Sequence, residues 1–259
     1  MVEVPREVLE ALDRVREDVD SIGDSVKDAE LRRAIKYYIE TPGKMIRPLL
    51  LLLFAYTLDA EGLRDRRIIN AASILETLHI VSLLQDDVID RHEERRGVKT
   101  PRALYGDAMS IVASDWLIAE AVERAAALGV DIVQYLANVA KRLSEGQALD
   151  VKGQRREAAE LKTAPLIEAA FVMPTLILRR RDLLRPAAAL GRALGVLYQY
   201  SDDMADEGVK NDMRPLIDEI RDALSNIKRA LGERAQPLER FIEAVVKRAL
   251  EGTLTVARL

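Results

Sequence analysis

Three aspartates close a largely apolar stretch of the sequence that begins at Ile68. Asp86 and Asp90 are four residues apart, and Asp87 follows the first of them. Because residues four apart share a face of a helix, the carboxylates of Asp86 and Asp90 repel each other unless a cation lies between them. Mg²⁺ prefers carboxylate oxygens and often joins one or two carboxylates to a substrate phosphate. Taken alone, the cluster is also what a solvated helix end would show.

A second aspartate cluster repeats the spacing of the first. Asp202, Asp203 and Asp206 close another largely apolar stretch, directly after Tyr198 and Gln199. One such cluster is weak evidence for a metal site. Two copies, each at the end of a predicted buried helix, indicate facing helices that hold metal ions between them.

Basic residues supply the opposite charge. Lys44 and Arg47 are three residues apart and are predicted to lie in the first turn of a helix, where backbone N–H groups also favour an anion. Further basic residues follow the first aspartate cluster (Arg95 and Arg96) or lie in a later predicted helix (Lys162, beside Thr163). Carboxylates for metal ions beside cations for phosphate predict a site for a highly charged phosphoester or a diphosphate, in which they would neutralise the charge of the leaving group.

The elements that must position these residues are helices. Apolar residues recur at spacings of three and four nearly throughout, and alternating strand patterns are missing. We predict about ten helices, over residues 6–20, 25–40, 44–58, 66–92, 101–127, 130–151, 155–180, 183–207, 213–231 and 236–252. No linker rich in Pro, Gly or Ser divides the chain, so residues 1–259 are predicted to form one all-α domain.

The composition excludes several classes of protein. The 259 residues are 49% hydrophobic and 32% charged, which is typical of a globular chain. The net charge of -4 argues against a nucleic-acid partner that is bound through bulk positive charge. No cysteine is present, so the chain has no disulfide and no thiolate metal site. Because no apolar run is long enough for a membrane span and the N-terminus does not resemble a signal peptide, we expect a cytoplasmic protein.

The order of the motifs resembles the trans-prenyltransferase family, the isoprenyl diphosphate (polyprenyl) synthetases. The resemblance runs from about residue 43 to 212. It comprises Gly-Lys-x-x-Arg-Pro, Asp-Asp-x-x-Asp followed by Arg-Arg-Gly, Gly146-Gln147 with Asp150, Lys162-Thr163, and Tyr198-Gln199 with the second Asp-Asp-x-x-Asp. It implies a bundle of about ten helices around a deep central cavity, two or three Mg²⁺ ions, and a homodimer.

The resemblance also implies a role for each matching residue. The metal ligands would be Asp86, Asp90, Asp202 and Asp203, supported by Asp87, Asp150 and Asp206. Isopentenyl diphosphate would be bound by Lys44, Arg47, His79 and Arg96, and the allylic diphosphate by Arg95, Lys162, Thr163 and Gln199, with Lys210 in the following loop. Asp86, Asp90, Asp202, Lys162 and Gln199 would be the catalytic residues. In the reaction of this family, loss of diphosphate gives an allylic cation, the double bond of isopentenyl diphosphate attacks it, and a proton leaves.

Product length is predicted from the residues that precede Asp86 on its helix face. Ser82, Leu78, Leu75 and Ala71 are small or aliphatic. Family members with short products carry an aromatic residue four or five positions before the first aspartate, where this chain has Ser82 and Val81. We therefore predict a product of twenty carbons or more. Met109 or Trp116 on a neighbouring helix is the alternative floor of the cavity.

The chain departs from the family pattern after Asp206, where the usual long lysine-bearing loop is shorter. Arg102 and Gln85 stand where histidine is common, although neither change removes a metal ligand. One alternative is therefore a poorly active or regulatory subunit of a heteromeric prenyl diphosphate synthase. Another is a different all-helical diphosphate enzyme, such as a terpene cyclase or a head-to-head condensing enzyme, but those lack the Gly-Lys-x-x-Arg-Pro motif.

Overall fold

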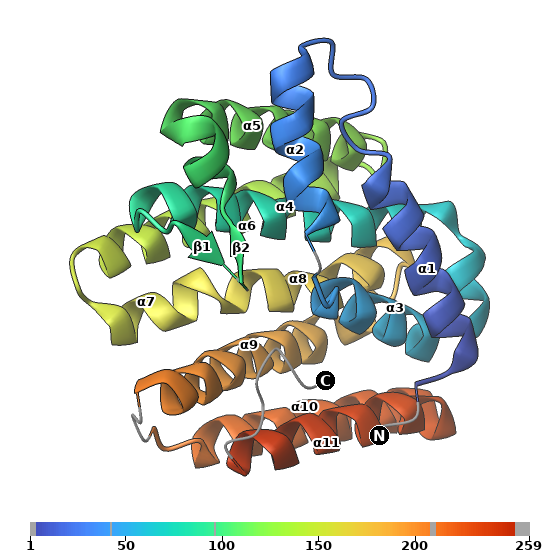
Figure 1. Cartoon of the computed structure of the whole chain (residues 1–259). Coiled ribbons are helices and arrows are strands. Elements are labelled where there is room, and N and C mark those ends of the chain that lie inside the picture. Colours follow the sequence, from blue (N-terminus) through green and yellow to red (C-terminus); the bar gives the residue numbers. More distant parts are fainter. Residues whose placement is uncertain (1–3, 42, 96, 208–210, 252–259) are drawn as a thin grey trace.

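The computed structural model describes residues 4–41, 43–95, 97–207 and 211–251, and it is almost entirely helical (Figure 1). The described α-helices are α1 (Arg6–Asp20), α2 (Ala29–Glu40), α3 (Ile46–Leu58), α4 (Arg66–Ile89), α5 (Pro101–Ala126), α6 (Val130–Val151), α7 (Arg155–Lys162), α8 (Ala164–Ile177), α9 (Leu184–Glu207), α10 (Arg214–Leu231) and α11 (Gln236–Leu250). Short 3₁₀ turns lie at Ala60–Arg64, Arg181–Leu183 and Gly232–Ala235. The predicted all-α fold is confirmed.

Two features differ from the sequence prediction. The helix predicted over 155–180 is divided at Thr163 into α7 and α8, and Pro165 lies in the first turn of α8, where a missing N–H costs nothing. The helix predicted over 66–92 ends at Ile89, and Arg91 adopts a left-handed conformation with φ 55°. The chain then forms a small antiparallel hairpin of β1 (Glu94–Arg95) and β2 (Val98–Lys99).

The centre of the bundle is formed by helices that are buried on more than one face. In α3 and α8 nearly every residue is buried, and α4 is buried along most of its length. The amphipathic helices α10 and α11 lie with α9 on one side of the molecule, while α2 and α5 lie on the opposite side (Figure 1). One hydrophobic cluster joins these elements, from Val8 in α1 to Ala249 in α11.

One described helix, α4, is long and apolar enough by length and composition to cross a membrane. Most of its apolar window is buried inside the protein, as is typical of a core helix.

Two glycines let helices approach closely enough to bring the predicted site residues together. A Cβ at Gly195 in α9 would lie 2.4 Å from the backbone of Ala164, and one at Gly146 in α6 would lie 2.6 Å from the backbone of Lys162. Each glycine is four residues before a predicted site residue, Gln199 and Asp150 respectively. Because nothing larger than hydrogen fits, these contacts fix α8 against α9 and α7 against α6 one turn from the site.

Candidate active site

Asp86 is the carboxylate of the first cluster that faces a neighbouring helix. Its side chain is 19% exposed. Burial raises its pKa, the charge of Lys162 opposes that shift, and the charge of Asp90 adds to it. The upward effect of Asp90 is the direction expected for two like charges one turn apart. A partly buried carboxylate of this kind gains from a nearby cation.

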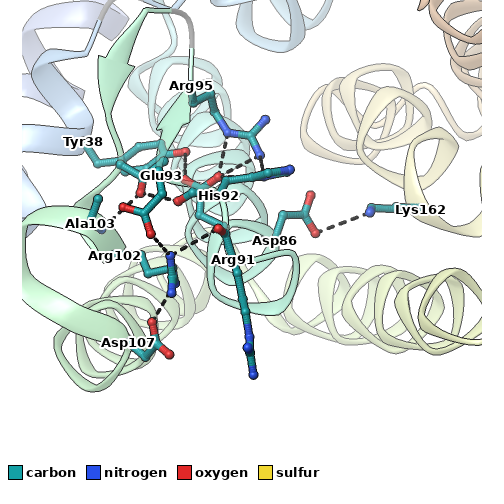
Figure 2. A network of polar contacts seen from close by, with 12 residues as sticks. Tyr38, Asp86, Arg91, His92, Glu93, Arg95, Arg102, Ala103, Asp107 and Lys162 are labelled. Carbon is teal, nitrogen blue, oxygen red and sulfur yellow. Dashed lines mark hydrogen bonds and ion pairs between the residues drawn. The ribbon is translucent and has the colours of Figure 1, made fainter. Parts of the chain in front are cut away.

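Lys162 provides such a cation from the end of α7. Its Nζ lies 2.7 Å from Oδ2 of Asp150 in α6 and 3.5 Å from Oδ1 of Asp86 in α4. Burial lowers the pKa of Lys162, but the hydrogen bond with Asp150 and the charges of both aspartates outweigh it, so the net shift is upward. Figure 2 shows the lysine reaching Asp86 from a separate helix. Three predicted site residues from three helices therefore meet at one point.

Thr163 and Gln199 are also brought together. The Thr163 hydroxyl donates a hydrogen bond of 2.6 Å to Oε1 of Gln199, across the close contact between α8 and α9. Asp202 lies one turn further along α9 and is partly buried. The side chains of Asp203 and Asp206, and residues Arg96 and Lys210 as a whole, lie outside the described part of the structure.

Asp87 points away from its two neighbours in the cluster. Its side chain is 1% exposed, and Arg95 of the hairpin contacts Oδ1 at 2.8 Å through one guanidinium nitrogen and donates a 2.9 Å hydrogen bond from Nε. The Tyr38 hydroxyl of α2 donates to Oδ2 at 3.1 Å, and Nδ1 of His92 lies 3.4 Å from Oδ1. Figure 2 shows Tyr38, His92 and Arg95 on the far side of Asp86 from Lys162. Asp87 thus holds Arg95 in place.

The sequence prediction did not include Tyr38 and His92. Both reach Asp87 through tertiary packing, from α2 and from the turn after α4, and no spacing within the sequence signals those contacts. Figure 2 also shows Arg102, which joins the same region through ion pairs with Glu93 and Asp107 at 2.7 and 2.8 Å. The pair with Glu93 ties the start of α5 to the segment that leads into the hairpin with Arg95.

The predicted basic cradle has a different local structure from the one expected. Helix α3 begins at Ile46, and Met45 before it is left-handed with φ 50°. Lys44 therefore precedes the helix, while Arg47 lies in its first turn. The Nζ of Lys44 and the Nε of Arg47 are both buried, so the two charges point into the protein.

A cavity of about 580 Å³ lies between α1, α2, α4 and the hairpin. Its lining includes Gly43 and Met45 on either side of Lys44, His79 from α4, and Arg95 with Lys99 from the hairpin. The predicted headgroup residue His79 therefore faces the same space as Arg95. The size of the cavity is in the range of small-molecule sites.

The residues predicted to set product length lie along α4 below Asp86. Leu78 and Ser82 are partly exposed, and Val81 is buried. The Ser82 hydroxyl donates a hydrogen bond to the carbonyl of His79. Leu75 and Ala71, further along the same face, are fully buried. On this face the partly exposed residues therefore run from Asp86 to Leu78, and the residues beyond them are buried.

The donor set fits a hard cation. Among the described side chains, no three His, Cys, Asp or Glu residues lie together as a complete metal-binding group. Asp86 and Asp90 nevertheless offer two carboxylates on one helix face, and the pKa of Asp86 is raised by burial and by Asp90. Mg²⁺ is often held by one or two carboxylates together with water and substrate phosphates. These residues would hold it in that way.

Comparisons with known proteins agree with this geometry. The polyprenyl synthetase family model matches residues 28–213. The geranylgeranyl pyrophosphate synthase of Geoglobus acetivorans is 32% identical over 213 residues, covering 75% of this chain and 66% of that protein. The geranylfarnesyl diphosphate synthase of Aeropyrum pernix is 33% identical over 199 residues, covering 70% of this chain and 62% of that protein. These matches span less than two thirds of each relative.

Solved structures share the fold over nearly the whole chain. A geranylgeranyl pyrophosphate synthetase structure from Geoglobus acetivorans superposes with a TM-score of 0.74 at 25% identity, covering 96% of this chain and 99% of that one. A geranyltranstransferase structure from Thermotoga maritima has a TM-score of 0.77 at 22% identity, covering 94% and 99%. The motifs lie on α3, α4, α7 and α9, and the family model matches most of the chain. This chain therefore belongs to the polyprenyl synthetase family.

Proposed function

We propose that the protein is a Mg²⁺-dependent prenyltransferase that condenses isopentenyl diphosphate with an allylic diphosphate, giving a trans-prenyl diphosphate of twenty carbons or more. The observation that carries this proposal is the approach of Lys162 to Asp86 and Asp150. It puts a cation that can bind phosphate beside carboxylates that can bind a metal, at the meeting point of α4, α6 and α7. Membership of the family supports it.

The allylic diphosphate is assigned to the Asp86 side of α4. In this proposal two or three Mg²⁺ ions would be held by Asp86, Asp90, Asp202 and Asp203, with Asp150 and Asp206 in support. The ions would neutralise the charge of the leaving diphosphate. The side chains that bind the diphosphate oxygens or face the developing allylic cation are those of Lys162, Thr163, Gln199, Arg95 and Lys210. Lys162 exchanges its contact with Asp86 for one with the diphosphate. Asp87 supports the site by fixing Arg95.

Isopentenyl diphosphate is assigned to the cradle and the adjoining cavity. Lys44 and Arg47 direct buried cationic nitrogens inward, and His79 lines the cavity. Together with Arg96 they bind the second diphosphate. In this proposal the two diphosphates are held close enough for the double bond of isopentenyl diphosphate to reach the allylic carbon of the other substrate.

Incubation with labelled isopentenyl diphosphate, Mg²⁺ and each of the five-, ten-, fifteen- and twenty-carbon allylic primers tests this function. We expect elongated products that disappear when the metal is chelated. The chain matches less than two thirds of the length of its curated relatives, and its segment after Asp206 is short. For these two reasons the second candidate is a subunit of a heteromeric synthase. Binding of both diphosphates without any product would favour that candidate and contradict ours.

Replacing Ser82 with phenylalanine is expected to shorten the product by at least one five-carbon unit. Ser82 is partly exposed on the face of α4 that runs from Asp86 to Leu78, so a ring there closes the path of the growing chain. Chromatography of the products measures the effect. A Ser144→Phe variant, changed at an exposed position of α6, is the control. An unchanged product length would place the floor of the cavity elsewhere, at Met109 or Trp116.

We also propose a homodimer, formed through α5. Five large apolar side chains of this helix are exposed, and they are Leu104, Ile111, Val112, Ile118 and Val122. Exposed large apolar side chains gathered on one helix are typical of an interface between protein chains. Sedimentation velocity should give twice the mass of the 29.0 kDa chain, and an Ile111→Asp variant should sediment as a monomer. A monomeric wild-type protein would contradict this assignment.

Two broader assignments belong to the same proposal. The chain forms a single domain, which the one hydrophobic cluster from α1 to α11 supports. It acts in the cytoplasm, which the absence of cysteine from the sequence supports.

A further inference from the structure

The hydroxyl of Tyr198 is a polar group with no role in the reaction described above. Tyr198 lies in α9 one helical turn before Asp202, so the two residues share a face of the helix. The residue is 4% exposed, and its hydroxyl is buried with no hydrogen-bond partner among the described residues. Buried hydroxyls in proteins nearly always have a partner. A buried hydroxyl without a protein partner can donate to a bound ligand.

Charges from three helices act on this hydroxyl. Burial has the largest effect on the pKa of Tyr198 and raises it, Arg47 of α3 lowers it, Asp202 raises it, and Arg248 of α11 lowers it. Of the three charges, that of Arg47 has the greatest influence. Helix α11 packs against both α3 and α9, which is consistent with a hydroxyl placed where the three helices meet. A tyrosine hydroxyl is protonated at neutral pH and can therefore donate a hydrogen bond.

We propose that the Tyr198 hydroxyl donates a hydrogen bond to the diphosphate bound by Arg47, that of the isopentenyl substrate. Phosphate oxygens are acceptors, and a buried donor beside a guanidinium adds directly to the binding of such a group. This inference rests on the proposed function, because that function assigns the diphosphate to Arg47. It adds a substrate-binding residue from α9, so this helix would contact both substrates, the allylic one through Gln199 and Asp202.

The Tyr198→Phe variant removes only the hydroxyl. We expect the Kd for isopentenyl diphosphate, measured by titration calorimetry, and its KM, measured from initial rates, to rise about tenfold or more, as for loss of a hydrogen bond to a charged group. The KM for the allylic primer should change less than about twofold. The Tm of the ligand-free protein should stay the same or rise, because a buried hydroxyl without a partner is removed.

Tyr200→Phe is the matched control, since Tyr200 lies two residues further on α9 and points to another face. It should change neither KM. Unchanged binding of isopentenyl diphosphate by Tyr198→Phe would overturn the inference. A lower Tm with an equal rise in both KM values would also overturn it, because it would show a structural role. If the wild-type protein forms no product but Tyr198→Phe still weakens binding of isopentenyl diphosphate, the proposed function fails and the inference stands.

Discussion

Replacing Asp86 with asparagine is expected to lower kcat about 10²- to 10³-fold, the range found when one preorganised electrostatic group is removed from an active site. Asp86 is the carboxylate that Lys162 approaches at 3.5 Å, and in our proposal it holds the metal that neutralises the leaving diphosphate. Asparagine keeps the shape of the side chain but removes its charge. Initial rates at saturating substrate and Mg²⁺ measure the effect.

The same variant should fold at least as well as the wild type without metal. Burial and Asp90 raise the pKa of Asp86 in the folded protein, so this carboxyl favours folding in its protonated form and loses that contribution as the pH rises through its folded pKa. Asparagine does not ionise, so the stability of the Asp86→Asn variant does not fall in this way as the pH rises. Its Tm near pH 7 should be equal to that of the wild type or higher. Mg²⁺ with inorganic pyrophosphate should raise the Tm of the wild type only.

Asp222 provides a matched control, because it is an exposed aspartate on α10. Asp222→Asn should leave kcat and the response to Mg²⁺ unchanged. An Asp86→Asn variant that keeps more than about a tenth of the wild-type kcat would contradict the role given to this carboxylate by the proposed mechanism.

Replacing Lys162 with methionine should have the second largest effect. The substitution keeps the length of the side chain but removes the charge that contacts Asp150 at 2.7 Å and Asp86 at 3.5 Å. Loss of a hydrogen bond to the allylic diphosphate should lower kcat/KM for the primer about 10- to 150-fold. The two aspartates also lose their counterion. Because the lysine and Asp150 are 27% and 26% exposed, we expect a loss of about 1–2 kcal/mol in the free energy of unfolding, less than for a fully buried pair.

Lys152 at the end of α6 is exposed and serves as the control, since Lys152→Met removes an equal charge from the surface. Denaturant unfolding and initial rates with varied primer separate the two effects of Lys162→Met. A loss of stability with an unchanged KM and kcat for the primer would show that Lys162 only supports the fold, and would contradict its assignment to the diphosphate.

Most of the fold could be predicted from the sequence, because the helices carry strong periodic patterns and clear end signals. The predicted range of 130–151 is the range of α6, and that of 101–127 differs from α5 by one residue. Asp86 could be selected because carboxylates that interrupt a largely apolar helix are costly unless they serve a site. Asp150, Thr163 and Gln199 could be assigned only through the resemblance of the motif order to the family.

The contacts made through tertiary packing could not be predicted. Asp87 shares a motif with Asp86, yet its side chain points to the other side of α4 and contacts Arg95 and Tyr38. Adjacent residues of a helix are about 100° apart around its axis, so a shared motif does not imply a shared partner. The hairpin after α4 was missed because its two-residue strands are too short to show an alternating pattern.

The most direct test of the central claim is a single-turnover experiment with enzyme in excess over one labelled allylic diphosphate, saturating isopentenyl diphosphate and Mg²⁺. Product and released pyrophosphate are measured in the same quenched samples. We predict one released pyrophosphate for each five-carbon unit added to the labelled primer, and neither product with Asp86→Asn or Asp202→Asn on the same timescale. Pyrophosphate released without an elongated product would show hydrolysis or cyclisation of the allylic substrate and would contradict the account.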